Sequence, residues 1–260
     1  MKKSRTKFLV GAAAVACIAL LVGVRTLYRY GGVVRQNDGR SAGESARRSA
    51  EQKGNASATA TSTKKLVALT FDDGPYGTST KQILDILKAK NVHATFFVLG
   101  MNVAKYPDEV RREIADGHLV GNHGYNHLQT YPTMSSSTFA LDLLRTEEAI
   151  VSSTGAHPTW YRPPYGALSA TMRQVLHDQG FRIALWNVDP EDWNYEKSSS
   201  TAIIRNVESH VRPDAIILMH DGRDTHINYP RDNTIRALPI IIDDLRARGY
   251  EFVTVDEIVK

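Results

Sequence analysis

From residue 65 to the C-terminus, short apolar segments alternate with segments whose apolar residues recur at helical spacing. The apolar segments lie at 66–71, 94–99, 119–122, 159–162, 182–188, 215–219 and 252–255. The amphipathic segments lie at 80–90, 107–116, 137–154, 169–179, 200–210 and 234–248. A continuous apolar run indicates a strand buried on both faces, and helices between such strands are typical of parallel sheets. The pattern therefore predicts an α/β fold, with parallel strands closed into a barrel or arranged as an open sheet.

The first 64 residues follow a different pattern. Residues 8–24 are apolar and carry no charge, and basic residues stand on both sides of them. This run is at the short limit for a membrane-spanning helix and somewhat long for a cleaved signal, which remains the alternative; we favour an uncleaved anchor with its N-terminus inside. Residues 35–64 are rich in Ser, Ala, Gly, Thr and charge, as in a flexible linker. We therefore expect a cytoplasmic tip and anchor (1–34), a linker (35–64) and a globular domain (65–260).

Composition narrows the possible partners. The 260 residues are 42% hydrophobic, enough for one domain with a sizeable core. Much of the basic excess behind the net charge of +4 lies in the N-terminal part, which suits a segment beside an anionic membrane or cell wall better than a surface that reads nucleic acid. Cys17 is the single cysteine, which excludes an internal disulfide and a cysteine-rich zinc site.

Ionisable side chains follow five of the seven predicted strands. In chain order they are Asp72 and Asp73, His123 and His127, Arg162, Asp189 and Asp192, and His220. Because the loops after parallel strands meet at one end of a barrel, we expect these side chains to converge there. This convergence indicates a catalytic site more strongly than any single motif does.

The chemistry of these residues favours a metal site with an acid beside it. His123 and His127 stand four residues apart, and with a carboxylate from the first strand they would form the two-histidine, one-carboxylate set of catalytic zinc. The alternative is a pair of surface or capping histidines. Arg162 precedes two prolines that would fix its backbone, and His220 would suit a general acid at the barrel mouth.

The chain resembles a known family at five motifs. They are Thr70-Phe71-Asp72-Asp73-Gly74-Pro75, His123-x-x-x-His127, Arg162-Pro163-Pro164-Tyr165-Gly166, Asp189-x-x-Asp192-Trp193 and Leu218-x-His220. In this order they resemble the motifs of polysaccharide deacetylases, the NodB-homology enzymes of carbohydrate esterase family four. The resemblance covers residues 65–258 and implies a distorted (β/α)₇ barrel.

The resemblance also implies roles for the site residues. Asp73, His123 and His127 would bind a divalent metal. Zinc is the expected metal, and Co²⁺ or another transition metal is the alternative. Asp72 would be the general base that deprotonates the attacking water. His220 would protonate the leaving amine.

The remaining motif residues would support these groups. Arg162 would orient Asp72 and lower its pKa, and Asp192 would orient His220. The backbone amide of Tyr165 would help to stabilise the oxyanion. The pocket for the acetyl group would be lined by Trp193 and Leu218.

One position departs from the family pattern. The residue after the first metal histidine is usually Ser or Thr, and here it is Gly124. A hydroxyl that would brace the loop between the two histidines is missing, although no ligand is lost. The departure bears on the rigidity of the loop and on metal affinity.

The sequence thus predicts a membrane-anchored, metal-dependent N-acetyl-sugar deacetylase that works outside the cytoplasm as a monomer, with no nucleic-acid partner. The anchor and linker favour N-acetylglucosamine of peptidoglycan as the substrate. Chitin oligomers, acetylxylan and N-acetylmuramic acid residues remain alternatives. Two other classes stay open: a glycoside hydrolase that uses paired carboxylates such as Asp72 and Asp192, and a wall-binding module without catalysis.

Overall fold

All seven predicted strands are present in the computed structural model, which describes residues 64–222 and 231–260. These residues belong to one compact unit, Ala60–Lys260. The strands are β1 (Lys65–Asp72), β2 (Thr95–Val98), β3 (Leu119–Asn122), β4 (Trp160–Tyr161), β5 (Arg182–Ile183), β6 (Ala215–His220) and β7 (Tyr250–Val253). All strand pairs are parallel, which confirms the predicted parallel α/β fold.

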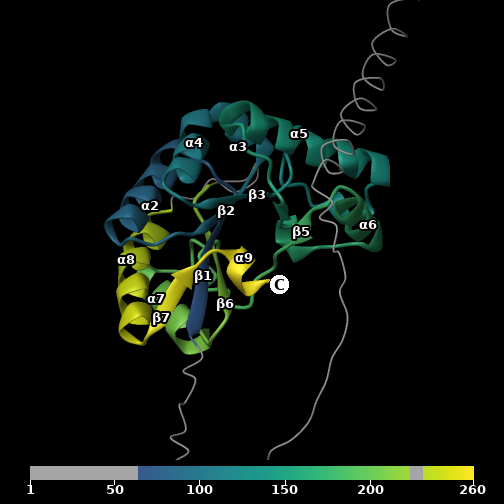
Figure 1. The fold of residues 1–260 in the computed structure, drawn as a ribbon. Helices are drawn as coiled ribbons and strands as arrows, with labels where there is room; N and C mark the ends of the chain where they lie inside the picture. The colour runs from purple at the N-terminus through teal and green to yellow at the C-terminus, as the bar shows by residue number, and fades with distance from the viewer. Residues whose placement is uncertain (1–63, 223–230) are drawn as a thin grey trace, which may run out of the picture. The chain divides into compact units, whose positions relative to one another are not determined.

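Helices connect the strands and surround them (Figure 1). They are α2 (Gly77–Ala89), α3 (Gly100–Lys105), α4 (Pro107–Ala115), α5 (Ser136–Thr154), α6 (Ala170–Asp178), α7 (Ser200–His210), α8 (Asp232–Ala247) and α9 (Val255–Ile258), with short 3₁₀ turns η1 (Tyr131–Thr133) and η2 (Pro164–Gly166). The start of three helices follows from local sequence. Ser135, Ser169 and Ser199 each accept a hydrogen bond from the backbone N–H three residues later, before α5, α6 and α7.

The sheet has the order β5-β4-β3-β2-β1-β6, with β7 paired to β1 outside this path, so β1 pairs with three other strands. Strand β6 pairs with β1 along positions 67–72. Strand β2 pairs with positions 70–72 and β7 with positions 65–68. A strand has two edges along which it can pair, and β6 pairs along one edge of β1. Strands β2 and β7 therefore pair along the other edge, one after the other.

The sheet curls until its two ends meet at one point. The segment after β5 reaches β6 through a parallel bridge between Val188 and Ile217, and the Leu218 N–H donates to the Val188 carbonyl oxygen at 2.9 Å. The predicted strand 182–188 is therefore wrong over most of its length, because only Arg182 and Ile183 pair with β4. A curled, barely closed barrel of parallel strands results.

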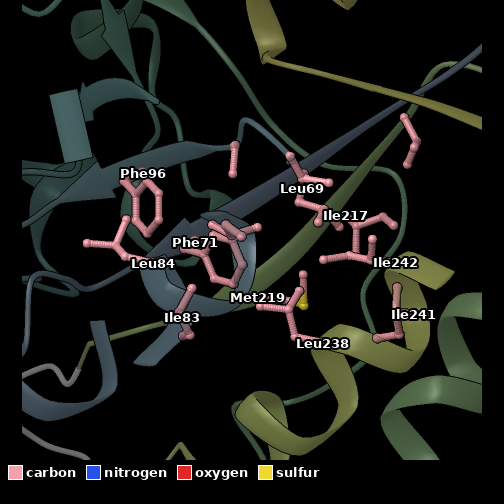
Figure 2. Packing of buried hydrophobic residues seen from close by; sticks show 14 of the residues in the cluster. Leu69, Phe71, Ile83, Leu84, Phe96, Ile217, Met219, Leu238, Ile241 and Ile242 are labelled. Atoms are coloured by element: carbon pink, nitrogen blue, oxygen red, sulfur yellow. The ribbon is translucent and has the colours of Figure 1, made fainter. Parts of the chain in front are cut away.

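Alternation along the strands separates an outer core from the barrel interior. Val67, Leu69 and Phe71 of β1 belong to the largest buried apolar cluster. Figure 2 shows Leu69 and Phe71 together with Ile217 and Met219 of β6, against residues of α2 and α8. The alternate positions of β1 therefore face the interior, since successive side chains of a strand point to opposite faces.

A separate apolar cluster fills the barrel interior at the end where the strands begin. It includes Ala68, Phe97, Trp160, Ile216 and Val255, the last from the start of α9. The Val255 N–H donates to the Thr95 hydroxyl at the first residue of β2. Because this end is filled with apolar side chains, the opposite end, where the strands finish, is the one that can carry a polar site.

The sequence pattern missed two short helices and shifted one strand. Helix α3 follows β2 directly and is too short to show a helical period. Strand β7 ends at Val253, two residues before the predicted end, because α9 begins at Val255. The predicted anchor at 8–24 and the linker at 35–64 lie outside the described residues. Within residues 64–222 and 231–260, no helix is both long and apolar enough to cross a membrane.

Candidate active site

The register of the strands brings the predicted site residues together. Asp72 ends β1 and pairs with His220, which ends β6. Both lie on the interior face of the sheet, as do Thr70 and Leu218, which come two residues earlier on the same strands. Asn122, the residue before His123, pairs with Tyr161, the residue before Arg162. Neighbouring strand ends therefore deliver carboxylates, imidazoles and a guanidinium to one place.

Asp73, His123 and His127, which the sequence predicts as metal ligands, lie together in a group that could hold a metal ion. One ligand atom from each lies within 4.8 Å of the others, and all three residues are buried. The Asp73 Oδ1 atom lies 3.6 Å from His123 Nε2 and 3.4 Å from His127 Nε2. Ligand atoms of a tetrahedral zinc site with bonds of about 2.0–2.1 Å stand about 3.3 Å apart. Asp73 Oδ1 is buried and has no hydrogen-bond donor among the described residues, so the group fits a divalent cation.

His123 is held in the tautomer that a metal ligand needs. Its Nδ1 atom lies 2.8 Å from the Arg162 carbonyl oxygen, which can only accept, so the proton is on Nδ1. The lone pair on Nε2 is left facing Asp73. Burial, and then the neighbouring His127, lower the pKa of His123 to about 3, so the imidazole stays neutral. A neutral imidazole binds a metal, whereas an imidazolium does not.

Asp72 lies between the metal-ligand group and Arg162. Its Oδ1 atom accepts from Arg162 Nη1 at 2.8 Å, and its Oδ2 atom lies 3.7 Å from His123 Nε2. Burial raises the pKa of Asp72, while the charge and hydrogen bond of Arg162 lower it, and the net shift is upward. Arg162 acts on the pKa of Asp72 in the direction that the family resemblance implies, but desolvation of the carboxyl outweighs it.

Arg162 is fully buried and its side chain is fixed on every side. Nη1 also donates to the Thr70 hydroxyl at 2.7 Å, while Nε and Nη2 donate to the carbonyl oxygens of Ala184 and Leu185 at 3.1 and 3.2 Å. The guanidinium lies 4.1 Å from the ring centre of Phe97. These contacts, more than the following prolines, determine where the guanidinium points.

His220 and Asp192 form the second buried pair. His220 Nδ1 lies 2.7 Å from Asp192 Oδ1, and the His220 backbone N–H donates to Asp192 Oδ2 at 2.9 Å. The Thr234 hydroxyl also donates to Oδ2, at 2.7 Å. Burial lowers the pKa of His220, the Asp192 carboxylate raises it, and the net shift is upward. Asp192 Oδ1 therefore faces the imidazole, while the two donors to Oδ2 hold the carboxylate in place.

The three predicted substrate-contacting residues lie around this centre. Tyr165 adopts a left-handed backbone with φ of 58°, and its half-exposed ring lies 4.5 Å from the ring of His127. Trp193 follows Asp192 and is 42% exposed. Leu218 is buried in β6, on the same face as His220.

The sequence gives no role to two buried charged residues that border the site, Asp221 and Arg231. Arg231 is buried, donates from Nε to the Gly222 carbonyl oxygen at 2.7 Å, and places Nη2 3.8 Å from Asp73 Oδ2. Asp221 is buried beside the first loop and accepts from the Thr80 hydroxyl at 2.5 Å. Asp221 directly follows His220 at the end of the sixth predicted strand, which is a signal for its place in the site. Arg231 had no such signal, because it comes from the start of another helix.

The C-terminal domain is similar to known proteins. Residues 59–184 match the family described as polysaccharide deacetylase. The chain is 38% identical over 190 residues to a chitooligosaccharide deacetylase of Rhizobium leguminosarum bv. trifolii, which corresponds to 71% of this chain and 87% of that protein. Among solved structures, peptidoglycan deacetylase PdaC from Bacillus subtilis matches with a TM-score of 0.67 at 36% identity, over 75% of this chain and 90% of that one.

A longer relative is also similar. The chain is 40% identical over 196 residues to the peptidoglycan-N-acetylglucosamine deacetylase PgdA of Listeria monocytogenes serotype 1/2a (strain 10403S). The match covers 75% of this chain but only 39% of that protein. The chain therefore spans about two fifths of the length of this relative.

Proposed function

The chain belongs to the polysaccharide deacetylase family, and on that premise we propose that it hydrolyses the N-acetyl group of a cell-wall polysaccharide, with release of acetate. N-acetylglucosamine of peptidoglycan is the proposed substrate, because similar proteins carry that name. The observation that carries the proposal is a buried Asp-His-His group with Asp72–Arg162 on one side and His220–Asp192 in the same site.

Amide hydrolysis needs an activated water, a sink for the charge of the oxyanion and a proton for the leaving amine. A divalent metal held by Asp73, His123 and His127 would activate the water and polarise the carbonyl as a Lewis acid. The neutral, correctly oriented His123 supports this assignment.

Asp72 is the proposed general base. Its Oδ1 is occupied by Arg162, so Oδ2, which faces His123, is the oxygen that can accept a proton from the water. The upward shift in the pKa of Asp72 makes the carboxylate a stronger base than an exposed aspartate. Arg162 holds the carboxylate in place throughout.

His220 is the proposed general acid. Because Nδ1 contacts Asp192, Nε2 is the atom that can deliver a proton to the amine. The upward shift in its pKa keeps more of the imidazole protonated near neutral pH. The two pairs thus have different roles. Asp72 would accept a proton from the water, and the imidazolium of His220 would donate a proton to the amine.

Substrate contacts are proposed for Tyr165, Trp193 and Leu218. The Tyr165 backbone amide would stabilise the oxyanion, and its strained left-handed conformation beside His127 supports a constrained position. Leu218 and the exposed Trp193 would form the walls that accept the acetyl methyl group.

The glycoside hydrolase alternative is less well supported. Such an enzyme needs two carboxyl groups that can act on the sugar directly. Asp192 accepts three hydrogen bonds from His220 and Thr234, which leaves it committed to the imidazole. A non-catalytic module is also disfavoured, because the proposed base, acid and ligands are all present.

We further propose that residues 8–24 anchor the protein in the cell membrane, with the catalytic domain facing the wall. The uncharged apolar run, the basic residues around it and the Ser- and Gly-rich stretch that follows support this location. A tethered enzyme would meet an insoluble substrate within reach of its linker.

Acetate release should be measured side by side on purified peptidoglycan, chitooligosaccharides and acetylxylan. We expect the fastest release from peptidoglycan, with N-acetylglucosamine residues converted to glucosamine residues that carry a free amine, and with no new reducing ends. Release from acetylxylan alone would overturn the substrate assignment. New reducing ends without acetate would overturn the reaction itself.

A further inference from the structure

The loop between the two metal-site histidines is held by residues that none of the five motifs contains. Gly124 lies in this loop with φ of 83°, a conformation that residues with a side chain rarely adopt. A Cβ atom on Gly124 would lie 2.5 Å from the Tyr131 hydroxyl oxygen and 2.8 Å from the ring carbon that carries it. The space that a side chain would need at Gly124 is therefore already filled by Tyr131.

The Tyr131 hydroxyl binds the backbone of this loop. It accepts from the N–H of Tyr125 at 3.0 Å and from the N–H of Asn126 at 3.4 Å, and it donates to Asp142 Oδ2 at 2.7 Å. The same Asp142 oxygen lies 3.0 Å from the Tyr125 N–H. Tyr131 is 1% exposed and Asp142 9%, so water does not compete for these bonds.

Both residues are anchored outside the loop. Tyr131 begins η1 and packs edge-on against Phe139, and Asp142 lies on the buried side of the long helix α5. Burial, and then Asp142, raise the pKa of Tyr131 further above its ordinary value, so the phenol keeps its proton. The pair therefore connects the loop to η1 and to the long helix α5.

Further hydrogen bonds hold the loop from the start of α3 and from the end of β3. The Gly100 and Met101 N–H groups at the start of α3 donate to the carbonyl oxygens of Gly124 and Tyr125 at 3.0 and 3.1 Å. Asn122 Oδ1 accepts from the Gly124 N–H at 2.8 Å. Tyr131 and Asp142 are therefore the side chains from η1 and α5 that hold the loop, in addition to its contacts with α3 and Asn122.

We propose that Tyr131 and Asp142 are positioning residues that set the separation of His123 and His127, and thereby the affinity of the site for its metal. Their hydroxyl and carboxylate replace the hydroxyl that is missing at Gly124, and glycine is needed there because the Tyr131 oxygen occupies the space. The inference rests on the proposed metal-dependent function. It concerns the metal site and not the proton transfers by Asp72 and His220.

Metal affinity is the direct test, measured by competition of zinc between the purified protein and a chromogenic chelator. We expect Tyr131→Phe to weaken zinc binding about 10- to 100-fold, the range typical for loss of a contact that orients a metal ligand. Asp142→Asn keeps an acceptor oxygen and should stay closer to wild type than Asp142→Ala. At saturating zinc, turnover of Tyr131→Phe should recover most of its loss.

Tyr161→Phe is the matched control. Tyr161 is also fully buried, its ring lies 5.7 Å from Phe139, and its hydroxyl has no hydrogen-bond partner within residues 64–222 and 231–260. Its removal should leave zinc affinity unchanged. Circular dichroism would identify any variant that fails to fold, and Asp142→Ala against Asp142→Asn then decides the question without Tyr131→Phe.

Two outcomes would be distinguishable failures. If wild type binds zinc and Tyr131→Phe and Asp142→Ala bind it equally well, or if Tyr161→Phe loses as much affinity as Tyr131→Phe, the positioning role is wrong while the metal-dependent function stands. If wild type binds no divalent metal at the Asp73 site, the proposed function itself fails.

Discussion

Replacing Asp192 by asparagine tests whether the Asp192 carboxylate keeps His220, the proposed general acid, protonated. Asp192 Oδ2 accepts from the His220 backbone N–H and the Thr234 hydroxyl, so the new amide nitrogen cannot occupy that position without opposing a donor. It must instead take the place of Oδ1 and face His220 Nδ1. The substitution therefore removes the negative charge and disfavours the imidazolium, which needs an acceptor at Nδ1.

The size of the effect follows from the geometry of the pair. The contacting atoms are 2.7 Å apart, and both residues are at least nine-tenths buried. With charge centres about 4 Å apart and an effective dielectric constant of about 20, their attraction is about 4 kcal/mol. That energy corresponds to a shift of about 3 pKa units as an upper bound, since 1.36 kcal/mol equals one unit.

The direction in which the pKa of His220 would move follows from the other influences on it. Burial lowers the pKa of His220, and Asp192 is what brings it above its ordinary value. Without the carboxylate the pKa should fall below that value. We expect the alkaline limb of the pH–rate profile to move to lower pH by about one to three units, with lower maximal turnover.

The assay is acetate release from a soluble chitooligosaccharide across pH at saturating zinc. Thr234→Val is the matched control, because it removes one hydrogen bond to Asp192 but leaves the charge in place, and its alkaline limb should move much less. An alkaline limb that stays in place or moves upward in Asp192→Asn would show that Asp192 does not raise the pKa of His220 in the working enzyme.

Three further predictions concern the metal, the base and the N-terminal segment. His123→Ala and His127→Ala should each abolish metal binding and turnover while the circular dichroism spectrum persists, because the ligands lie outside the apolar core; elemental analysis gives the metal content. Asp72→Asn should keep the metal but reduce turnover by a factor of about 100 or more, since the attacking water loses its base, and single-turnover acetate release measures this. A truncated protein of residues 62–260 should be soluble and active on small oligomers, whereas the full chain should remain in the membrane fraction after a high-salt wash; an intact mature protein that begins near residue 25 would contradict the uncleaved anchor.

Much of the fold and site could be predicted because parallel strands give a simple signal. Strands β2 and β6, and β1 over most of its length, are buried on both faces and read as apolar runs, and the residue after such a strand lies at the end of the barrel where the loops meet. Asp72, His123, Arg162 and His220 all follow such runs, and the structure brings them together. That these four residues converge could be predicted without knowing where the helices lie.

What could not be predicted depends on contacts between distant segments. Arg231 reaches Asp73 from the start of α8, and Tyr131 and Asp142 reach the histidine loop from η1 and α5. No periodicity or spacing connects these positions. The direction in which the pKa of Asp72 shifts could not be predicted from the sequence either. It depends on whether the effect of burial, which raises the pKa, is larger than the effect of Arg162, which lowers it.

The central claim is that one metal site and two acid–base pairs hydrolyse an N-acetyl amide. The most direct measurement is simultaneous assay of acetate and of reducing ends from purified peptidoglycan, with protein as purified, after removal of metal by a chelator, and after zinc is returned. We predict acetate without reducing ends, its loss with the metal to below about one hundredth, and its recovery with about one zinc per chain. Undiminished acetate release from metal-free protein would contradict the account.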